Sequence, residues 1–291
     1  MSDDGERAIS IIAFIGSVFS PWYRWSGRRD PENHVCVNVA TYGRGGRFTM
    51  TDRGRDALRH SAQRFEVGPS ALEWDGTSLT VRIDEIAAPP LPGRVRGTVR
   101  LVPAAITDVE MPLTPDGAHV WRPFAPVARI AVDLEAEGWT WDGHGYLDGN
   151  FGTRALEADF SHWTWGRFPD GDGTLCFYDA DRRDGTHLAS AARFAPDGRV
   201  ETVTPPPLRP MRRTLWQVRR TTRGDAGSTP RQVKPMLEAP FYSRAMVETT
   251  LSGHRTVGVH EALDLDRFAS PWLKPMIALR VPRRPRWTFR D

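Results

Sequence analysis

Apolar and polar residues alternate along short stretches of the chain. In SLTVRID (78–84) every second residue is apolar, and ARIAVDLE (128–135) repeats the alternation. A period of two puts these apolar side chains on one face of a β-strand. Helical periodicity is scarce: residues 52–62 have enough of it for two or three turns, and 260–270 for a short helix. The pattern predicts an all-β protein with few short helices.

Asp-Gly pairs separate the alternating stretches, at 75–76, 116–117, 142–143, 170–171, 184–185 and 197–198. This dipeptide favours tight hairpin turns, because both central positions of such a turn need a positive φ. Segments 72–83 and 193–203 are therefore predicted to be hairpins. A meander of antiparallel strands in a chain of this size is typical of β-barrels and β-sandwiches.

Two proline-rich stretches, 86–94 and 204–213, cannot form central strands, because proline lacks the N–H that a sheet requires. Residues 221–232 have the composition of a polar loop. The chain has 291 residues, which is enough for two domains. We expect an N-terminal β domain over 1–153 and a C-terminal β domain over 154–291.

The composition is that of an ordinary globular protein, with 40% hydrophobic and 26% charged residues. The net charge is +3, and arginine supplies nearly all of the positive charge, because the only lysines are Lys234 and Lys274. Basic residues are interspersed with aspartates, and no RNP motif, zinc finger or helix-turn-helix pattern occurs, so we expect no nucleic-acid partner. An arginine-rich surface favours contact with anionic lipid headgroups, although a GC-rich genome produces the same bias.

Cys36 and Cys176 are the only cysteines, and their spacing suggests neither a disulfide framework nor a zinc site. The apolar run 8–23 follows an acidic start, MSDDGER. It is shorter than the roughly 20 apolar residues that span a bilayer, and it lacks the basic region and cleavage site of a signal peptide. We therefore expect a cytoplasmic protein that is able to contact a membrane surface.

A carboxylate stands among aromatic residues in GYLDGNFG (145–152). Tyr146 and Asp148 are two apart, so they share one side of the sheet if the segment is extended. His119 and Trp121 in AHVWRP have the same spacing. Further aromatic residues are candidates for the wall of a pocket: Trp139, Trp141, Phe151, Trp163 and Trp165. A polar spot in an aromatic cavity suits an elongated apolar ligand.

In such a cavity we expect the pKa of Asp148 to be raised, because loss of water disfavours the charged form. A protonated carboxyl group is able to give its proton to a carbon–carbon double bond, which creates a tertiary carbocation at a trisubstituted isoprenoid end. Tryptophan rings would stabilise that cation by about 2 kcal/mol each when desolvated. His119 must then be neutral or out of direct contact, because an imidazolium would ionise the acid. The competing interpretation makes Asp148 a turn residue and the tryptophans part of the core.

Other chemistries lack their motifs. The sequence has no G-x-S-x-G and no P-loop, and YGRGGRF (42–48) has the wrong spacing for a dinucleotide-binding fingerprint. The remaining histidines lack metal-ligand spacing with carboxylates, and we expect His254 and His260, six residues apart, at the surface. The expected chemistry therefore uses no metal and no other cofactor.

Three longer stretches carry a family resemblance. GHGYLDGNFGTRALEADFSHWTWGRF (143–168) resembles the signature of the acyclic carotenoid 1,2-hydratases, also called hydroxyneurosporene synthases. Residues 8–25 are similar to the start of that family and 268–287 to its end, so the resemblance covers nearly the whole chain. The family is similar to tandem lipocalin-like (calycin) proteins, which implies two antiparallel β-barrel or β-sandwich domains.

The resemblance implies a cofactor-independent hydratase in the carotenoid biosynthesis of a phototrophic bacterium. It would add water across the terminal C1=C2 double bond of acyclic carotenoids such as neurosporene and lycopene. The family's general acid falls on Asp148 and the tyrosine of the same segment on Tyr146. The H-x-W pair of the family falls on His119, which would position the acid or the water, and on Trp121, which would stabilise the cation.

This chain departs from the family pattern at two positions. Gly149 and Phe151 stand where many relatives have histidine and tryptophan. The missing histidine puts in doubt any role for it as the partner of the acid. The missing tryptophan weakens the aromatic cage.

The implied substrate resides in the bilayer, so we expect peripheral contact with the inner or photosynthetic membrane. Segments 8–25, 209–220 and 280–290 are candidates for that contact, and each is also compatible with an ordinary strand or a solvated face. Two other functions stay open. One is a lipocalin-like carrier that binds a lipid or pigment without changing it, and the other is a terpenoid cyclase or isomerase.

Overall fold

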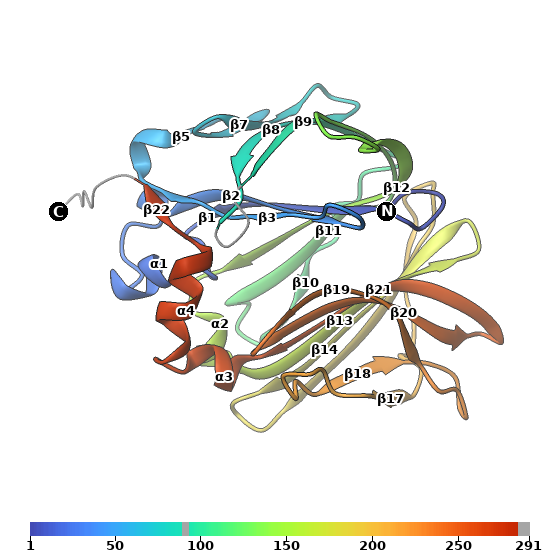
Figure 1. The fold of residues 1–291 in the computed structure, drawn as a ribbon. Coiled ribbons are helices and arrows are strands. Elements are labelled where there is room, and N and C mark those ends of the chain that lie inside the picture. The colour runs from blue at the N-terminus through green and yellow to red at the C-terminus, as the bar shows by residue number, and fades with distance from the viewer. Residues whose placement is uncertain (89–92, 285–291) are drawn as a thin grey trace. The chain divides into compact units, whose positions relative to one another are not determined.

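The computed structural model describes residues 1–88 and 93–284. Within these ranges the chain consists mainly of strands, joined by short turns and accompanied by a few short helices (Figure 1). The proline-rich residues 89–92 and most of the candidate membrane segment 280–290 lie outside the described residues. No helix in the described part of the chain is long and apolar enough to cross a bilayer.

Two of the sheets contain the first twelve strands. The first has the order β1–β2–β4–β22, with β3 beside β2. Its strands are β1 (Ala8–Ile15), β2 (Val35–Tyr42), β3 (Phe48–Thr49), β4 (Asp52–Arg53) and β22 (Arg283–Arg284). The second has the order β10–β11–β9–β8–β7–β6–β5, with β12 beside β11. Its strands are β5 (Leu58–His60), β6 (Arg64–Val67), β7 (Ser70–Trp74), β8 (Leu79–Ile86), β9 (Arg94–Pro103), β10 (Met111–Pro112), β11 (His119–Leu134) and β12 (Thr140–Gly152).

The third sheet is antiparallel throughout and has the order β16–β15–β14–β13–β21–β20–β19. Its strands are β13 (Phe160–Asp170), β14 (Gly173–Arg182), β15 (His187–Phe194), β16 (Val200–Thr202), β19 (Arg231–Ala239), β20 (Tyr242–Leu251) and β21 (His254–Asp264). A separate two-stranded ladder joins β17 (Leu208–Met211) and β18 (Arg220–Arg223). The α-helices are α1 (Pro21–Trp25), α2 (Leu156–Asp159), α3 (Leu265–Ala269) and α4 (Leu273–Arg280). None of these sheets closes on itself within the described residues, so of the two expected architectures, barrel or sandwich, the closed barrel is not observed.

The chain divides into two compact units. Among the described residues, the first unit takes those of 1–103, 128–146 and 271–284, and the second unit is 104–127 with 147–270. Strands β11 and β12 therefore each begin in one unit and end in the other. The expected domain division at 153/154 stays a prediction, because a spatially compact unit is not by itself an independently folding domain.

The hairpins that the alternation and the turns predict are confirmed. β7 pairs with β8 over 71–82, and β15 pairs with β16 over 192–202. In β8, Val81 and Ile83 of the alternating apolar residues are buried, whereas Arg82 between them is exposed. In β11 the alternation at 130–134 is complete, with every second residue buried.

The Asp-Gly pairs form turns by a different backbone route from the expected one. Five of the six glycines have positive φ, at positions 76, 117, 171, 185 and 198. None of the preceding aspartates has a positive φ, so these turns do not have the expected pair of left-handed residues. The sixth pair, at 142–143, is not a turn at all: Gly143 lies inside β12 and forms a bridge to Ser2. A Cβ at Gly143 would lie 1.9 Å from the Met1 carbonyl oxygen, so only glycine fits there.

The helix predictions are only partly right. Residues 52–62 were expected to be helical and instead form β4, a single 3-10 turn at 55–57 and β5. Cross-strand pairing of β5 with β6 outweighs the weak helical period there. The short helix predicted over 260–270 is found only in the second half of that range, because β21 continues to Asp264 and α3 begins at Leu265.

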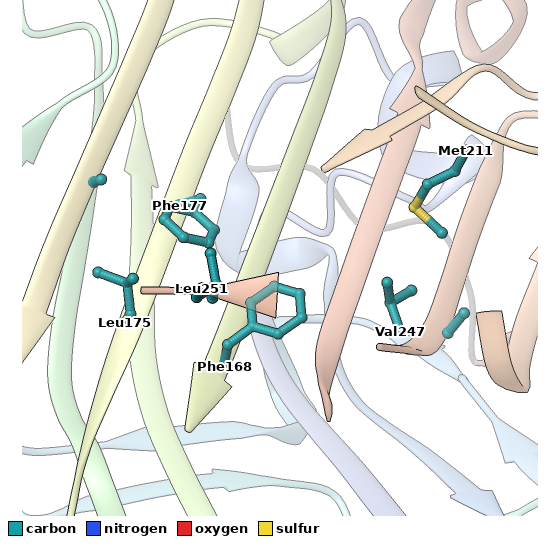
Figure 2. Packing of buried hydrophobic residues seen from close by; sticks show 8 residues of the cluster. Phe168, Leu175, Phe177, Met211, Val247 and Leu251 are labelled. Carbon is teal, nitrogen blue, oxygen red and sulfur yellow. The ribbon is translucent and has the colours of Figure 1, made fainter. Parts of the chain in front are cut away.

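One face of the third sheet packs on the β17–β18 ladder. The cluster there consists of Phe168, Leu175, Phe177, Ala191, Met211, Ala245, Val247 and Leu251, all buried (Figure 2). Met211 comes from β17, whose Pro210 is tolerated because this two-stranded ladder is not part of a larger sheet.

Two histidines attach the ladder to the same face. His260 Nε2 bonds the Thr221 carbonyl at 2.7 Å, and His162 Nε2 bonds the Arg219 carbonyl at 3.0 Å. The expectation of a surface position for His260 is therefore wrong, since this side chain is 1% exposed. It lies on the buried side of β21 with Gly258 and Ala262, a side that the alternation of Val257 and Val259 does not mark in the sequence.

Candidate active site

Aromatic residues occupy the other face of the third sheet. In β13, Trp163 and Trp165 are half-buried and alternate with His162, Thr164 and Gly166, which are buried. The register pairs Trp165 with Tyr178 of β14, and Tyr178 with Ser190 of β15. Directly paired residues project to the same side of a sheet. The three strands thus place Trp163, Trp165, Tyr178 and Ser190 on one surface.

Trp121 of β11 lies against this surface and is 1% exposed. Its ring centroid is 5.8 Å from that of Tyr178 and 6.4 Å from that of Phe194. Tyr178 in turn lies 5.7 Å from Trp163. These separations fall within the range of favourable aromatic pairs. Trp121, Tyr178, Trp163 and Phe194 form what we call the aromatic cluster, and all four belong to the second unit.

Asp148 of β12 contacts the aromatic cluster through a hydrogen bond. The indole Nε1 of Trp121 donates to Asp148 Oδ2 at 2.8 Å. Asp148 is half-buried and belongs to the second unit as well. The structure therefore brings two of the four predicted site residues into direct contact, with an N–H donor fixing one oxygen of the carboxyl group.

A cavity of about 260 Å³ opens beside the aromatic cluster. Trp121 and Tyr178 form part of its wall, and most of the remaining wall is apolar, including Met111, Leu113, Leu188 and Val200. The cavity lies within the second unit. Its volume is below the 300–1,000 Å³ that is common for sites enclosing a whole drug-sized ligand. It is therefore suited to a small apolar group or to one end of a longer molecule.

Tyr178 is the central residue of the aromatic cluster, and the sequence reasoning missed it. It is 6% exposed. Burial raises the pKa of its phenol, so Tyr178 stays neutral at any physiological pH. The signal in the sequence was the Asp170-Gly171 turn. A tight hairpin there pairs Asp170 with Gly173, and the same register five residues further from the turn pairs Trp165 with Tyr178.

His119 is buried and has a carboxylate partner other than Asp148. Its Nε2 lies 2.8 Å from Asp159 Oδ2. Arg154 also binds Asp159, with Nε 3.0 Å from Oδ2 and Nη2 2.9 Å from Oδ1. The Arg154 hydrogen bonds lower the pKa of Asp159, and the His119 contact lowers it further. Asp159 is thus an ionised acceptor, to which His119 Nε2–H donates.

The ring of His119 depends on a glycine beside it. A Cβ on Gly152 would lie 2.8 Å from His119 Nδ1. The ring also packs on Phe160, with centroids 5.2 Å apart. Glycine at 152 therefore leaves room for the imidazole at the end of β12.

The other predicted site residues have different surroundings. Tyr146 is half-buried in β12 and, by strand alternation, projects to the same side as Asp148. Trp139 and Trp141 belong to the first unit, and the Arg7 guanidinium lies 4.8 Å from the centre of the Trp139 ring. Phe151 is 54% exposed. Trp163 and Trp165, by contrast, lie on the face of the third sheet that carries Tyr178.

The described residues offer no group of three or more His, Cys, Asp or Glu side chains arranged to hold a metal ion. The groups at the candidate site are the Asp148 carboxyl group, the indole donor of Trp121 and the neutral phenol of Tyr178.

Known proteins resemble the chain over almost its full length. A family model described as "Carotenoid hydratase CrtC" matches residues 11–290. The acyclic carotenoid 1,2-hydratase of Cereibacter sphaeroides is 62% identical over 96% of this chain and 100% of its own length. The protein of the same name from Rhodobacter capsulatus is 61% identical over 97% of this chain and 100% of its own.

A solved structure supports the fold. A Nitrosomonas europaea protein assigned as AttH superposes with a TM-score of 0.59 at 14% identity, covering 91% of this chain and 89% of that one. This likeness concerns the fold alone, and it confirms the expected lipocalin-like, antiparallel β architecture. Together, the near-complete match to the family model and the identity to the two hydratases establish that the chain belongs to the CrtC family of carotenoid hydratases.

Proposed function

We propose that this protein adds water across the terminal C1=C2 double bond of an acyclic carotenoid such as neurosporene or lycopene, as a cofactor-independent step of carotenoid biosynthesis. The observation that carries the proposal is the hydrogen bond to Asp148 Oδ2 from the Nε1 of Trp121, a residue of the mainly apolar cavity wall. A carboxyl group in that position is able to act as an acid toward a substrate that has no polar group of its own.

Asp148 is the general acid of the proposed reaction. Its carboxyl proton passes to C2, the π electrons of the double bond form the new C–H bond, and C1 becomes a tertiary carbocation. Water then attacks C1, and the proton that this water loses returns to the Asp148 carboxylate. The net change is the addition of one water molecule, and the acid is regenerated.

The aromatic cluster supplies what the cation needs. Trp121 and Tyr178 line the cavity, and an aromatic ring whose face meets a positive charge stabilises it by up to about 2 kcal/mol when desolvated. Tyr146 stays a candidate on its spacing of two from Asp148 in the sequence. Because Tyr178 is neutral, its ring approaches the cation without being a competing base.

We assign His119 a positioning role. The Asp159–Arg154 pair fixes its ring at Nε2, two residues from Trp121 on the same strand. His119 would orient the attacking water or keep the β11–β12 edge in register, without direct ion pairing to the acid.

The proposal is tested with purified protein and lycopene or neurosporene in detergent, in water enriched in ¹⁸O. The hydratase product gains one water carrying the label, whereas a carrier returns unchanged carotenoid and a cyclase or isomerase returns a product without added oxygen. Asp148→Asn should abolish turnover while carotenoid binding persists. Asp142→Asn, an exposed aspartate of the same strand, is the matched control. Equal activity in the wild type and Asp148→Asn would remove Asp148 from the mechanism.

We also propose that the protein works at the surface of the inner or photosynthetic membrane, because its carotenoid substrate is a hydrocarbon that partitions into the bilayer.

A further inference from the structure

Helix α4 is apolar on two opposite sides. On its inner side Leu273 is buried, and Ile277 packs against the core cluster of Cys36, Met50 and Val281. On its outer side, Trp272 directly before the helix, Met276 and Leu279 are 63%, 46% and 73% exposed. A helix that meets only water on its outer side carries polar residues there. The outer side of α4 instead carries large apolar side chains, with Arg280 as an exposed charged residue at its end.

These exposed side chains form one stripe. Positions 272, 276 and 279 are spaced i, i+4 and i+7, which places them on the same face of a helix. Helix α1 packs beside α4 (Figure 1), and Trp22 Nε1 donates to the Val281 carbonyl at 2.6 Å. The outermost residue of α1, Trp25, is 49% exposed. Trp25, Trp272, Met276 and Leu279 make up what we call the α1–α4 surface, and all four belong to the first unit.

The segments that carry this surface are strongly basic. Residues 17–29 and 271–284 contain no aspartate or glutamate. They contain seven basic residues, Arg24, Arg28, Arg29, Lys274, Arg280, Arg283 and Arg284. With seven basic and no acidic residues, these two segments have a formal charge of +7, which gives the neighbourhood of the α1–α4 surface a basic character.

We propose that the α1–α4 surface docks on an anionic lipid bilayer, with Met276 and Leu279 among the acyl chains and Trp25 and Trp272 at the headgroup level. Tryptophan is enriched at that level, and each nearby arginine adds attraction to anionic headgroups. The reason for docking comes from the proposed function, because an enzyme whose polyene substrate resides in the bilayer has to reach the bilayer.

The charge favours lipid over a second copy of the chain. A two-fold dimer through this surface would bring two sets of arginines together without carboxylates between them. The α4 stripe of Trp272, Met276 and Leu279 lies outside the membrane segments expected from the sequence. Trp25 is the last residue of the expected segment 8–25, whose first part is β1, which pairs along its whole length with β2.

The test is co-sedimentation of the full chain with vesicles of phosphatidylcholine alone or mixed with phosphatidylglycerol. The wild type should bind the anionic vesicles, and 0.5 M salt should weaken binding. Met276→Glu/Leu279→Glu should reduce binding at least tenfold. Val102→Glu/Val233→Glu adds the same charge at two exposed apolar positions outside the surface, and it should bind like the wild type. Circular dichroism and thermal midpoints check that each variant is folded.

Three outcomes would overturn the proposal. The first is unchanged vesicle binding by Met276→Glu/Leu279→Glu. The second is loss of binding only in Leu215→Glu, which alters another exposed apolar residue, 93% exposed. The third is a wild-type dimer that becomes monomeric in Met276→Glu/Leu279→Glu, which would assign the surface to a second copy.

Activity separates this inference from the proposed function. With lycopene in detergent micelles, Met276→Glu/Leu279→Glu should hydrate like the wild type, and with lycopene in anionic vesicles it should be at least tenfold slower. If the wild type hydrates nothing under either condition but its vesicle binding depends on α4, the proposed function fails and the docking surface stands.

Discussion

Trp121 combines two properties in one side chain at the candidate site. The edge of the indole holds Asp148 through Nε1–H, and the ring belongs to the aromatic cluster beside the cavity. The two properties can be separated by substitution, because phenylalanine keeps a ring and loses the donor.

We expect Trp121→Phe to lower kcat by about 10- to 100-fold. The Asp148 carboxyl group becomes charged as it gives up its proton, and a hydrogen bond to a charged group contributes roughly 1.5–3 kcal/mol. About 1.4 kcal/mol corresponds to a factor of ten in rate. Trp121→Leu should lose more, since the ring goes as well. Trp163→Phe is the matched comparison: the buried Nε1 of Trp163 has no hydrogen-bond partner among the described residues, so its loss should cost less. Equal losses in the two Trp→Phe variants would show that the N–H of Trp121 has no special role.

Tyr178 tests the ring face without the donor. Tyr178→Phe should keep kcat within a few-fold, and Tyr178→Leu should lower it by about 30-fold, the equivalent of one desolvated cation–π contact of about 2 kcal/mol. Phenylalanines with one, two and three ring fluorines at position 178 should lower kcat progressively, because fluorine withdraws charge from the ring face. If kcat did not change with the number of fluorines, the Tyr178 ring would contribute packing and no cation stabilisation.

At the scale of elements, the alternation of β8 and β11 and the Asp-Gly turns made the hairpins predictable, because both signals are local. Residues 52–62 were not predictable in the same way. Their helical period is weak, and the pairing of β5 with β6 decides their structure. The contact of Trp121 with Asp148 was anticipated only as a shared spacing of two in separate segments. Tyr178 was missed because its place depends on the register between β13 and β14.

The attachment of the β17–β18 ladder to β21 should be sensitive to acid. Burial lowers the pKa of His260 to about 4, and the neighbouring positive charge of Arg220 acts in the same direction. Its Nδ1 has no hydrogen-bond partner among the described residues, so a second proton would be a buried, unsolvated charge. The unfolded chain takes up that proton at an ordinary histidine pKa near 6.5.

The folded state therefore binds fewer protons than the unfolded state between about pH 6.5 and 4, so stability falls as the pH is lowered through that window. The contribution of His260 is on the order of 3 kcal/mol. Burial of His162 lowers its pKa too and adds to the same trend. Urea denaturation at pH 7, 6 and 5 should show the loss, and His260→Gln should show a smaller one. A His260→Gln curve parallel to that of the wild type would contradict this account.

At the scale of the whole molecule, the candidate site takes residues from both sides of the domain division expected at 153/154. Trp121 and Asp148 precede residue 153, and Tyr178 follows it. We expect fragments 1–153 and 154–291, expressed separately, to be inactive with lycopene, because neither contains both the acid and the complete aromatic cluster. Activity in mixed fragments would show that the halves reassemble. Activity in 1–153 alone would show that the second half is dispensable for catalysis.

The small volume of the cavity has a consequence for symmetric substrates. About 260 Å³ receives one tip of a long polyene, not both. Lycopene has two equivalent tips, so the molecule must leave, turn round and come back before its second tip reacts. Hydration should thus be distributive: the monohydroxy compound accumulates first, and the dihydroxy compound appears after a lag that shortens as enzyme concentration rises. A time course that showed both products from the start, in a fixed ratio, would require the polyene to thread past the acid without being released.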